Sequence, residues 1–357
     1  MYFRKDLNNR PVPKISVPHK NTMMCLNESF LDPFDVIKET FLDEMKDVHV
    51  NRYFSNITDK LNIELENYLG IPQSWFLFGN GADEMLYNLF ISVRENNDSF
   101  ATTLSPSYFD YSTYCKAVGL GIKFIDLDFN FDFSVDDFIQ QANDDNCKLA
   151  ILCTPNNPTS NFLSDEKIFR ILSELDKPVL IDETYFEFSG KTFIDFIDQY
   201  PNLIIIRTFS KAFSAAGLRF GVIISNEDNI LQIKKTMTFF HSGLLTQTFA
   251  YSILKNKKIF LDHNKNIILM RDQMYNEMKK ISKIKVYKSA TNFLLFTAGE
   301  DSLSLFEYLM EKEIAIRNVS SGKILKNHLR VTISSHEDNK LFLDTLTQFF
   351  NKQKEKR

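Results

Sequence analysis

Short apolar runs alternate with longer amphipathic stretches between about residue 51 and residue 255. The apolar runs have the length of buried β-strands, and several intervening stretches have the length and spacing of helices. Strands are predicted at 75–78, 100–104, 122–127, 149–153, 179–181, 203–206 and 220–224, with helices at 82–94, 108–118 and 164–175. This alternation predicts an α/β fold in which helices cover both faces of a mostly parallel sheet.

The pattern changes at both ends of the chain. Up to about residue 50, four prolines and weak periodicity predict an irregular arm followed by one helix. Beyond residue 255, the sequence predicts a smaller α+β domain, with a long helix at 261–280, strands near 286 and at 293–296, 314–316 and 329–333, and a last helix at 337–350. We therefore expect three parts, residues 1–50, 51–255 and 256–357.

Composition and charge narrow the class of protein. The 357 residues are 44% hydrophobic, which is enough to bury a large core, and the net charge of -4 disfavours a general nucleic-acid partner. No apolar run reaches the roughly 18–20 residues that cross a bilayer, and charges stand where a signal peptide has its apolar core, so a cytoplasmic protein without a membrane partner is expected. The six histidines form no close pair that would indicate a metal site.

One loop between two predicted strands combines groups that suit a covalent cofactor. Residues 207–221 read RTFSKAFSAAGLRFG, in which Ser210 precedes Lys211 and Arg219 follows eight residues later. An amine condenses with an aldehyde only when it is unprotonated, and burial near other cations lowers its pKa. Ser210 and Arg219 could then hold the phosphate of the same cofactor. The loop alone would also fit an ordinary exposed turn.

An acidic residue ends one of the predicted buried strands. Asp182, in the segment LIDETY (180–185), is rarely structural at such a position without a cationic partner. A protonated pyridine nitrogen is such a partner, and its protonation makes the ring an electron sink. Asn157, in CTPNNPT (153–159), follows another apolar strand and could donate to the phenolic oxygen of the ring.

Two more segments follow predicted strands in the same way. GNGADE (79–84) precedes a helix, and the backbone N–H groups at a helix N-terminus suit a phosphate. Tyr108, after the next strand, could stack on a flat heterocycle. Each segment has an ordinary alternative as a turn, a cap or a core residue. Five of them at the carboxyl ends of successive strands argue against coincidence, because ligands of such sheets bind there.

Together these segments closely resemble the fold-type I enzymes that depend on pyridoxal 5'-phosphate (PLP), and within them the histidinol-phosphate aminotransferase family. The motifs NGADE, CTPNNPT, IDETY and SKAF…AGLRFG occur in order at family-like intervals, and the resemblance covers about residues 26–350. It implies a PLP-dependent aminotransferase with a large PLP-binding domain and a smaller α+β domain.

The resemblance also implies roles for single residues. Lys211 would be the Schiff-base lysine and the general acid/base, Asp182 would hold the pyridinium, and Tyr185 would bind the phenolic oxygen together with Asn157. The remaining cofactor contacts would be Tyr108, stacked on the ring, and Ala82, Asp83, Ser210 and Arg219, around the phosphate.

Further implied contacts lie beyond the cofactor. Tyr53, in NRY (51–53), would reach the cofactor phosphate of a neighbouring subunit, which implies a homodimer with shared active sites. Arg330 would bind the carboxylate or phosphate of the substrate. Arg317 would be a second anion contact, although a surface position is an alternative for it. The implied reaction exchanges an amino group between an amino acid, with glutamate and 2-oxoglutarate expected, and a small phosphorylated amine or ketone.

The N-terminal arm departs from the family pattern. The chain reads NESF at 27–30 where the family has Asn-Glu-Asn-Pro, the segment 10–13 lacks the usual tyrosine, and Ser160 replaces a glycine. Because the arm helps to line the substrate pocket, a three-carbon phosphate such as dihydroxyacetone phosphate stands beside histidinol phosphate as a candidate substrate.

Three other functions can be compared with this hypothesis. A PLP-dependent decarboxylase of threonine or serine phosphate shares CTPNNPT and GLR, but SKAF in place of its Thr-Lys pattern favours amino transfer. A PLP-fold transcriptional regulator would carry an additional DNA-binding domain. A nicotinamide dehydrogenase would need a third glycine where Phe124 stands.

Overall fold

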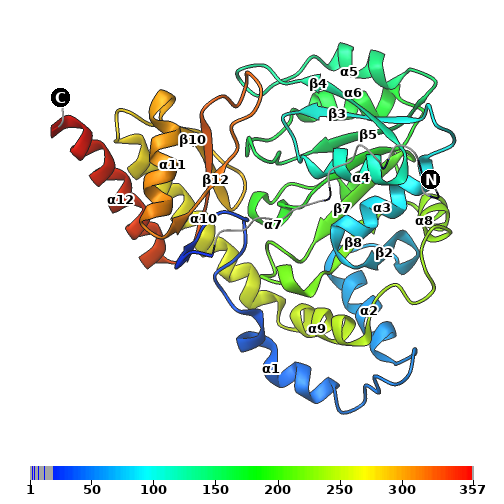
Figure 1. Cartoon of the computed structure of the whole chain (residues 1–357). Coiled ribbons are helices and arrows are strands. Elements are labelled where there is room, and N and C mark those ends of the chain that lie inside the picture. The colour runs from blue at the N-terminus through cyan, green and yellow to red at the C-terminus, as the bar shows by residue number, and fades with distance from the viewer. Residues whose placement is uncertain (1, 3, 5–6, 8–11, 13–18, 356–357) are drawn as a thin grey trace.

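The computed structural model describes residues 2, 4, 7, 12 and 19–355, so much of the predicted N-terminal arm, including residues 10, 11 and 13, lies outside the described residues. A seven-stranded sheet in the order β2-β8-β7-β6-β5-β3-β4 forms the centre of the larger part of the molecule (Figure 1). The strands are β2 (Phe76–Gly79), β3 (Phe100–Ser105), β4 (Gly121–Asp126), β5 (Cys147–Cys153), β6 (Val179–Asp182), β7 (Leu203–Thr208) and β8 (Gly221–Ile224). β8 runs in the direction opposite to that of the other six strands, which confirms the predicted mostly parallel sheet.

Side chains alternate along the strands between two hydrophobic layers. In β5, Leu152 belongs to one layer, whereas Ile151 and Cys153 belong to the other. Because both faces are covered, the strand reads as a continuous apolar run. The helices α3 (Gly81–Val93), α4 (Asp110–Val118) and α8 (Glu227–Lys234) supply one layer, and α2 (Ile57–Leu69), α5 (Val135–Ala142), α6 (Asp165–Glu174) and α9 (Leu244–Lys255) supply the other.

Local signals explain where several of these helices begin and end. The side chain of Asp32 accepts from the backbone N–H of Phe34 and caps α1 (Pro33–Glu44), whose first position is a proline. Ser134 caps α5 in the same way. Gly119 ends α4 with φ 81°, a left-handed conformation that glycine adopts at low cost.

A second hydrophobic cluster holds the smaller part of the molecule together. An antiparallel sheet in the order β12-β13-β10-β9 packs against helices on the side away from the larger sheet (Figure 1). Its elements are α10 (Lys257–Lys279), β9 (Lys285–Val286), β10 (Phe293–Thr297), α11 (Ser302–Glu311), β12 (Arg317–Asn318), β13 (His328–Thr332) and α12 (His336–Glu355). The predicted α+β character is confirmed, and α10 begins four residues before its predicted start.

The described N-terminal segment joins this smaller part. The short strand β1 (Thr22–Met23) pairs in parallel with β11 (Ile314–Ala315), and the backbone N–H of Thr332 donates to the carbonyl of Met24. We call residues 24–30 the strap, because they continue from this pairing toward the carboxyl edge of the large sheet. Among the described helices, none combines the length and the apolar character that a membrane span requires.

Candidate active site

The structure brings the carboxyl ends of β2, β3, β5, β6 and β7 to one edge of the large sheet. Since β8 is antiparallel, its first residue lies at this edge as well. Residues predicted to form the site follow these strand ends directly or within a few positions; they are Ala82, Asp83, Tyr108, Asn157, Asp182, Tyr185, Ser210, Lys211 and Arg219. The parallel topology therefore gathers residues that are up to 137 positions apart in the sequence.

Lys211 is half-buried immediately beyond β7. Its Nζ donates a hydrogen bond to the carbonyl oxygen of Leu26 in the strap, at 2.9 Å. Burial lowers the pKa of Lys211 to about 8, and the positive charge of Arg330 acts in the same direction. A lysine with this pKa is partly neutral near pH 7, which is the form that attacks an aldehyde.

Asp182 is a buried carboxylate at the end of β6. The backbone N–H of Thr184 donates to its Oδ1 at 2.9 Å, and the hydroxyl of Tyr111 donates to its Oδ2. Burial raises the pKa of Asp182, and no cation forms an ion pair with it among the described residues. A buried carboxylate in this condition fits a ligand that brings its own positive charge, as a protonated pyridine ring does.

The start of α3 forms a cradle for an anion. Gly81 has φ 81°, and Gly221 at the start of β8 approaches so closely that a Cβ on it would lie 2.3 Å from the backbone nitrogen of Ala82. Only glycine permits this approach of strand and helix. The N–H groups of the first turn thus face the carboxyl edge of the sheet, where an anion such as a phosphate is stabilised.

Arg219 and Ser210 lie beside this cradle. Arg219 Nη2 donates to Asp83 Oδ2 at 2.7 Å, and Arg219 has the left-handed φ of 57°. Ser210 is buried, and its hydroxyl accepts from Thr208 at 3.0 Å. The hydroxyl of Tyr108 points to the other oxygen of Asp83, at 3.4 Å. A guanidinium, a hydroxyl and helix N–H groups together make a donor set suited to a phosphate.

Arg330 reaches this edge from β13 in the smaller sheet. Its Nη1 donates to Asn157 Oδ1 and its Nη2 to the carbonyl oxygen of Cys25, both at 2.8 Å. Its Nε is buried and has no hydrogen-bond partner among the described residues. Burial lowers the pKa of Arg330, and the neighbouring Arg317 adds to this effect. Arg330 is thus a desolvated cation with an unused donor, which suits an anionic ligand.

Two further predicted residues have contrasting positions. Arg317 is directly opposite Arg330 in the register of β12 and β13, so the two side chains are cross-strand neighbours. Tyr53 is 73% exposed and stacks on Phe240, with ring centroids 4.3 Å apart. Within this single chain, Tyr53 is therefore not among the buried residues of the site.

The sequence prediction missed four contributors. Tyr111 follows Tyr108 by three residues, a helical spacing that could have identified it as a second ring on the same face. The strap supplies the other three. The carbonyls of Cys25 and Leu26 hold Arg330 and Lys211, and Asn27 Nδ2 donates to the hydroxyl of Tyr185 at 2.8 Å. No local pattern marks these contacts, because their partners are far along the chain.

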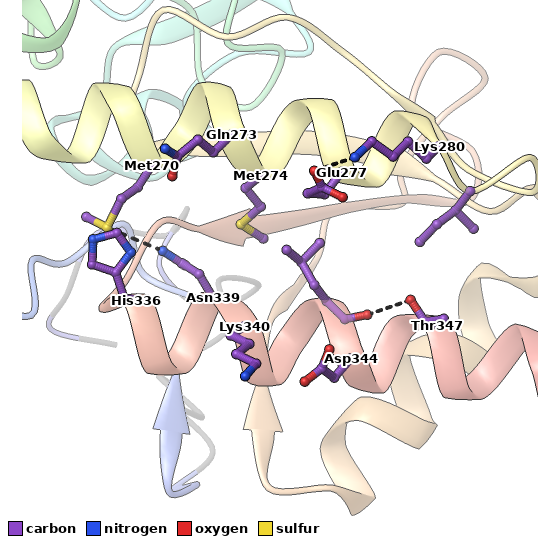
Figure 2. A pocket seen from close by; sticks show the side chains of 12 residues that line it. Met270, Gln273, Met274, Glu277, Lys280, His336, Asn339, Lys340, Asp344 and Thr347 are labelled. Atoms are coloured by element: carbon purple, nitrogen blue, oxygen red, sulfur yellow. Dashed lines mark hydrogen bonds and ion pairs between the residues drawn. The ribbon is translucent and has the colours of Figure 1, made fainter.

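A separate groove of about 750 Å³ lies between α10 and α12 (Figure 2). Its lining mixes apolar and charged side chains, and Glu277 and Lys280 form an ion pair within it. The groove contains none of the predicted site residues and none of the strand ends of the large sheet. We therefore place the candidate active site at the sheet edge rather than in this groove. The described residues also contain no group of three or more His, Cys, Asp or Glu side chains arranged to hold a metal ion.

Comparisons with known proteins identify the family of the chain. Residues 20–346 match the family of class I and II aminotransferases. A histidinol-phosphate aminotransferase from Clostridium kluyveri is 33% identical, over 94% of both chains. The structure also resembles the histidinol-phosphate aminotransferase of Sinorhizobium meliloti in complex with PLP, with a TM-score of 0.86, 19% identity, and 99% and 98% of the two chains covered. An L-threonine-O-3-phosphate decarboxylase from Porphyromonas gingivalis has a TM-score of 0.77 at 21% identity, covering 92% of this chain and 99% of its own.

The two structural likenesses are below 25% identity and show the shared fold, which confirms the predicted fold class. The family assignment depends on the sequence matches, which span nearly the whole chain. The buried lysine, the unpaired aspartate and the phosphate cradle fit PLP as the cofactor. The chain belongs to the class I and II aminotransferases and, among them, to the PLP-dependent histidinol-phosphate aminotransferase family.

Proposed function

We propose that the enzyme exchanges an amino group between an amino acid, with glutamate and 2-oxoglutarate as the expected pair, and a small phosphorylated amine or ketone. One observation supports an anionic, phosphorylated substrate. Arg330 and Arg317 lie side by side on neighbouring strands, and the charge of Arg330 is close enough to Lys211 to lower its pKa. A substrate anion bound by this pair would therefore have its reacting carbon near the lysine amine.

Within that class, two substrates remain candidates. Histidinol phosphate is supported by the name and the coverage of the Clostridium kluyveri relative. A three-carbon phosphate such as dihydroxyacetone phosphate is supported by the departure from the family pattern at Ser29 and Phe30. These residues directly follow the part of the strap that contacts Lys211, Tyr185 and Arg330.

The residues of the chain would divide the chemical work. PLP, when bound, supplies an aldehyde and an electron-withdrawing ring. Asp182 would pair with the ring nitrogen and keep it protonated. Tyr185 and Asn157 would hold the phenolic oxygen, and Tyr108 would stack on the ring. Lys211, with a pKa near 8, would take a proton from the substrate carbon and return it, which typically contributes about 10²–10⁴-fold.

We further propose that the enzyme is a homodimer and that residues 51–255 and 256–357 form its two main domains. Four exposed aromatic side chains come from two neighbouring segments of the described chain, Tyr53 and Phe54 from one and Phe239 and Phe240 from the other. Tyr53 and Phe54 contact Phe240, and Phe239 is 97% exposed. Such a patch is typical of a protein interface, and Tyr53 within it would reach the partner's phosphate cradle.

The test is a panel of oxo compounds added to the enzyme loaded with pyridoxamine 5'-phosphate. Imidazole acetol phosphate, dihydroxyacetone phosphate and 2-oxoglutarate are added singly, and the return of the aldehyde absorbance is recorded. We expect 2-oxoglutarate and one of the two phosphates to restore it. Lys211→Ala serves as the control, because it should lose turnover and the borohydride-fixed cofactor.

Two results would contradict the proposal in different ways. Release of carbon dioxide from threonine phosphate or serine phosphate, without amino transfer, would establish the decarboxylase alternative, which could use the same anion-binding arginines. Purified protein that stays colourless when supplied with PLP would remove the cofactor site itself.

A further inference from the structure

Asn27, in the strap, is buried and is held by several hydrogen bonds. It is 1% exposed and has a left-handed φ of 56°, a conformation that asparagine tolerates better than most residues. Its backbone N–H donates to Thr332 Oγ1 at 2.9 Å, and its carbonyl accepts from Asn292 Nδ2 at 3.0 Å. Both the backbone and the side chain of Asn27 are therefore fixed by the smaller sheet and its flanking loop.

These bonds also fix which way the side-chain amide points. Because Thr332 Oγ1 accepts from the Asn27 backbone, its own proton is available to donate to Asn27 Oδ1, at 3.2 Å. The amide oxygen thus faces Thr332, and the amide nitrogen faces Tyr185. Asn27 Nδ2 donates to the Tyr185 hydroxyl oxygen at 2.8 Å.

The hydroxyl of Tyr185 is consequently an acceptor toward Asn27. A phenolic hydroxyl has one proton, and an oxygen that accepts from a donor keeps that proton for a different partner. Tyr185 is 2% exposed, and its ring packs edge-on against Phe293 with centroids 5.4 Å apart, so the ring has little freedom to turn. The proton of the Tyr185 hydroxyl is therefore available to an acceptor in the active site.

We propose that Asn27 is a positioning residue that acts through Tyr185. By donating to the hydroxyl oxygen, it forces Tyr185 to donate its proton to the phenolic oxygen of PLP rather than to accept there. The inference rests on the proposed role of Tyr185 as a cofactor contact. A donor at the phenolic oxygen withdraws electron density from it and weakens its hold on the proton of the nitrogen that joins Lys211 to the cofactor. Asn27 therefore lowers the pKa of that nitrogen.

The test is a pH titration of the visible absorbance of the bound cofactor, which reports the protonation of this nitrogen without turnover. Asn27→Gly removes the amide and keeps the positive φ at little steric cost. A neutral hydrogen bond corresponds to a shift of roughly 0.5–1 pH unit, so the midpoint should rise by about this amount. Asn27→Asp offers an acceptor in place of the donor and should raise the midpoint further.

A comparison in the Tyr185→Phe variant tests whether Asn27 acts through the Tyr185 hydroxyl. Tyr185→Phe should itself raise the midpoint, and adding Asn27→Gly to it should produce no further change. Ser29→Ala is the matched control in the same strap, because Ser29 contacts His263 instead of Tyr185, and its midpoint should equal that of the wild type. Cofactor content and circular dichroism confirm that each variant is folded and loaded.

The existing charges around the site are retained in all these variants, and only Asn27→Asp adds a carboxylate. Lys211 faces Arg330, Glu28, Asp83 and Arg219, and Tyr185 faces Arg330, Cys153 and Asp182. An unchanged midpoint in Asn27→Gly, or an equal shift with and without the Tyr185 hydroxyl, would overturn the inference while leaving the proposed function intact. A wild type that stays colourless when supplied with PLP would instead overturn the proposed function.

Discussion

Asp182 shows how the environment of a single side chain indicates its partner. The carboxylate receives two hydrogen bonds yet has no cation of its own among the described residues, and burial raises its pKa. The cationic ring nitrogen of the cofactor would supply the missing charge. Removing one member of a buried ion pair is costly, because the other charge is left without compensation.

Asp182→Asn tests this pairing at nearly constant shape. Breaking a buried pair costs about 3–5 kcal/mol, so kcat/KM should fall by roughly 10²–10⁴-fold. Steady-state kinetics measure the loss, and the absorbance of the bound cofactor shows whether the site is still loaded. Asp198→Asn changes an exposed carboxylate that precedes the amino end of β7, and it should leave both unchanged. Near-normal turnover of the Asp182 variant would contradict the pairing.

At this scale the sequence predicted the residues that follow strand ends and missed those that depend on distant partners. Lys211, Asp182 and the cradle residues were recognisable because each stands next to a local pattern of strand, turn or helix start. Asn27 was not recognisable, since its partner Thr332 is 305 positions away. A local sequence pattern cannot reveal a contact between residues so far apart in the chain.

The phosphate cradle depends on the close contact between α3 and β8. The strand passes so near the helix start that a methyl group on Gly221 would overlap the backbone nitrogen of Ala82. Backbone atoms cannot move aside as the end of a flexible side chain can. The N–H groups of the helix start are therefore positioned by the absence of a side chain on the neighbouring strand.

Gly221→Ala should push the two elements apart. Overpacking of this kind typically costs about 1–3 kcal/mol, so the variant should unfold at a lower temperature and bind PLP more weakly. Gly217→Ala is the matched control in the same loop, because a Cβ there meets no atom within 4 Å and should alter neither property. Thermal unfolding and PLP titration provide the measurements. Equal behaviour of the two variants would contradict the steric argument.

The seven strands of the large sheet were predicted close to their observed bounds. For the inner strands β5, β6, β7 and β8 the reason is that continuous apolar runs are the signature of strands buried on both faces. Five helices of the same part were not predicted individually, namely α2, α5, α7 (Phe186–Ser189), α8 and α9. α5 and α8 have eight residues each, which gives the helical period little room to show. α10 begins before its predicted start since only Asn256 separates it from α9.

For the whole molecule, the exposed aromatic patch is the feature that one chain leaves unexplained. Phe239 is 97% exposed and Tyr53 73%, although such side chains are ordinarily covered. A second copy of the chain would bury them and would also complete the phosphate site with Tyr53. The predicted homodimer and the predicted domain boundaries remain proposals at this scale.

Phe239→Asp should separate the subunits, because it would place a carboxylate in the apolar centre of the interface. Analytical ultracentrifugation should give the mass of two chains for the wild type and of one chain for the variant, with activity lost in parallel. Phe129→Asp changes a 71% exposed phenylalanine in the loop after the edge strand β4 and should leave the mass unchanged. A wild-type mass of one chain would contradict the shared site.

The strap has a consequence for the order of events in the cell. Residues 25–27 are synthesised before the strand that carries Arg330 and Thr332. The cradle and Lys211 are made in between. During synthesis, PLP could therefore meet an aldehyde-reactive lysine before β13 is there to hold the strap that orients its amine, and the finished pocket can form only once that strand has been made.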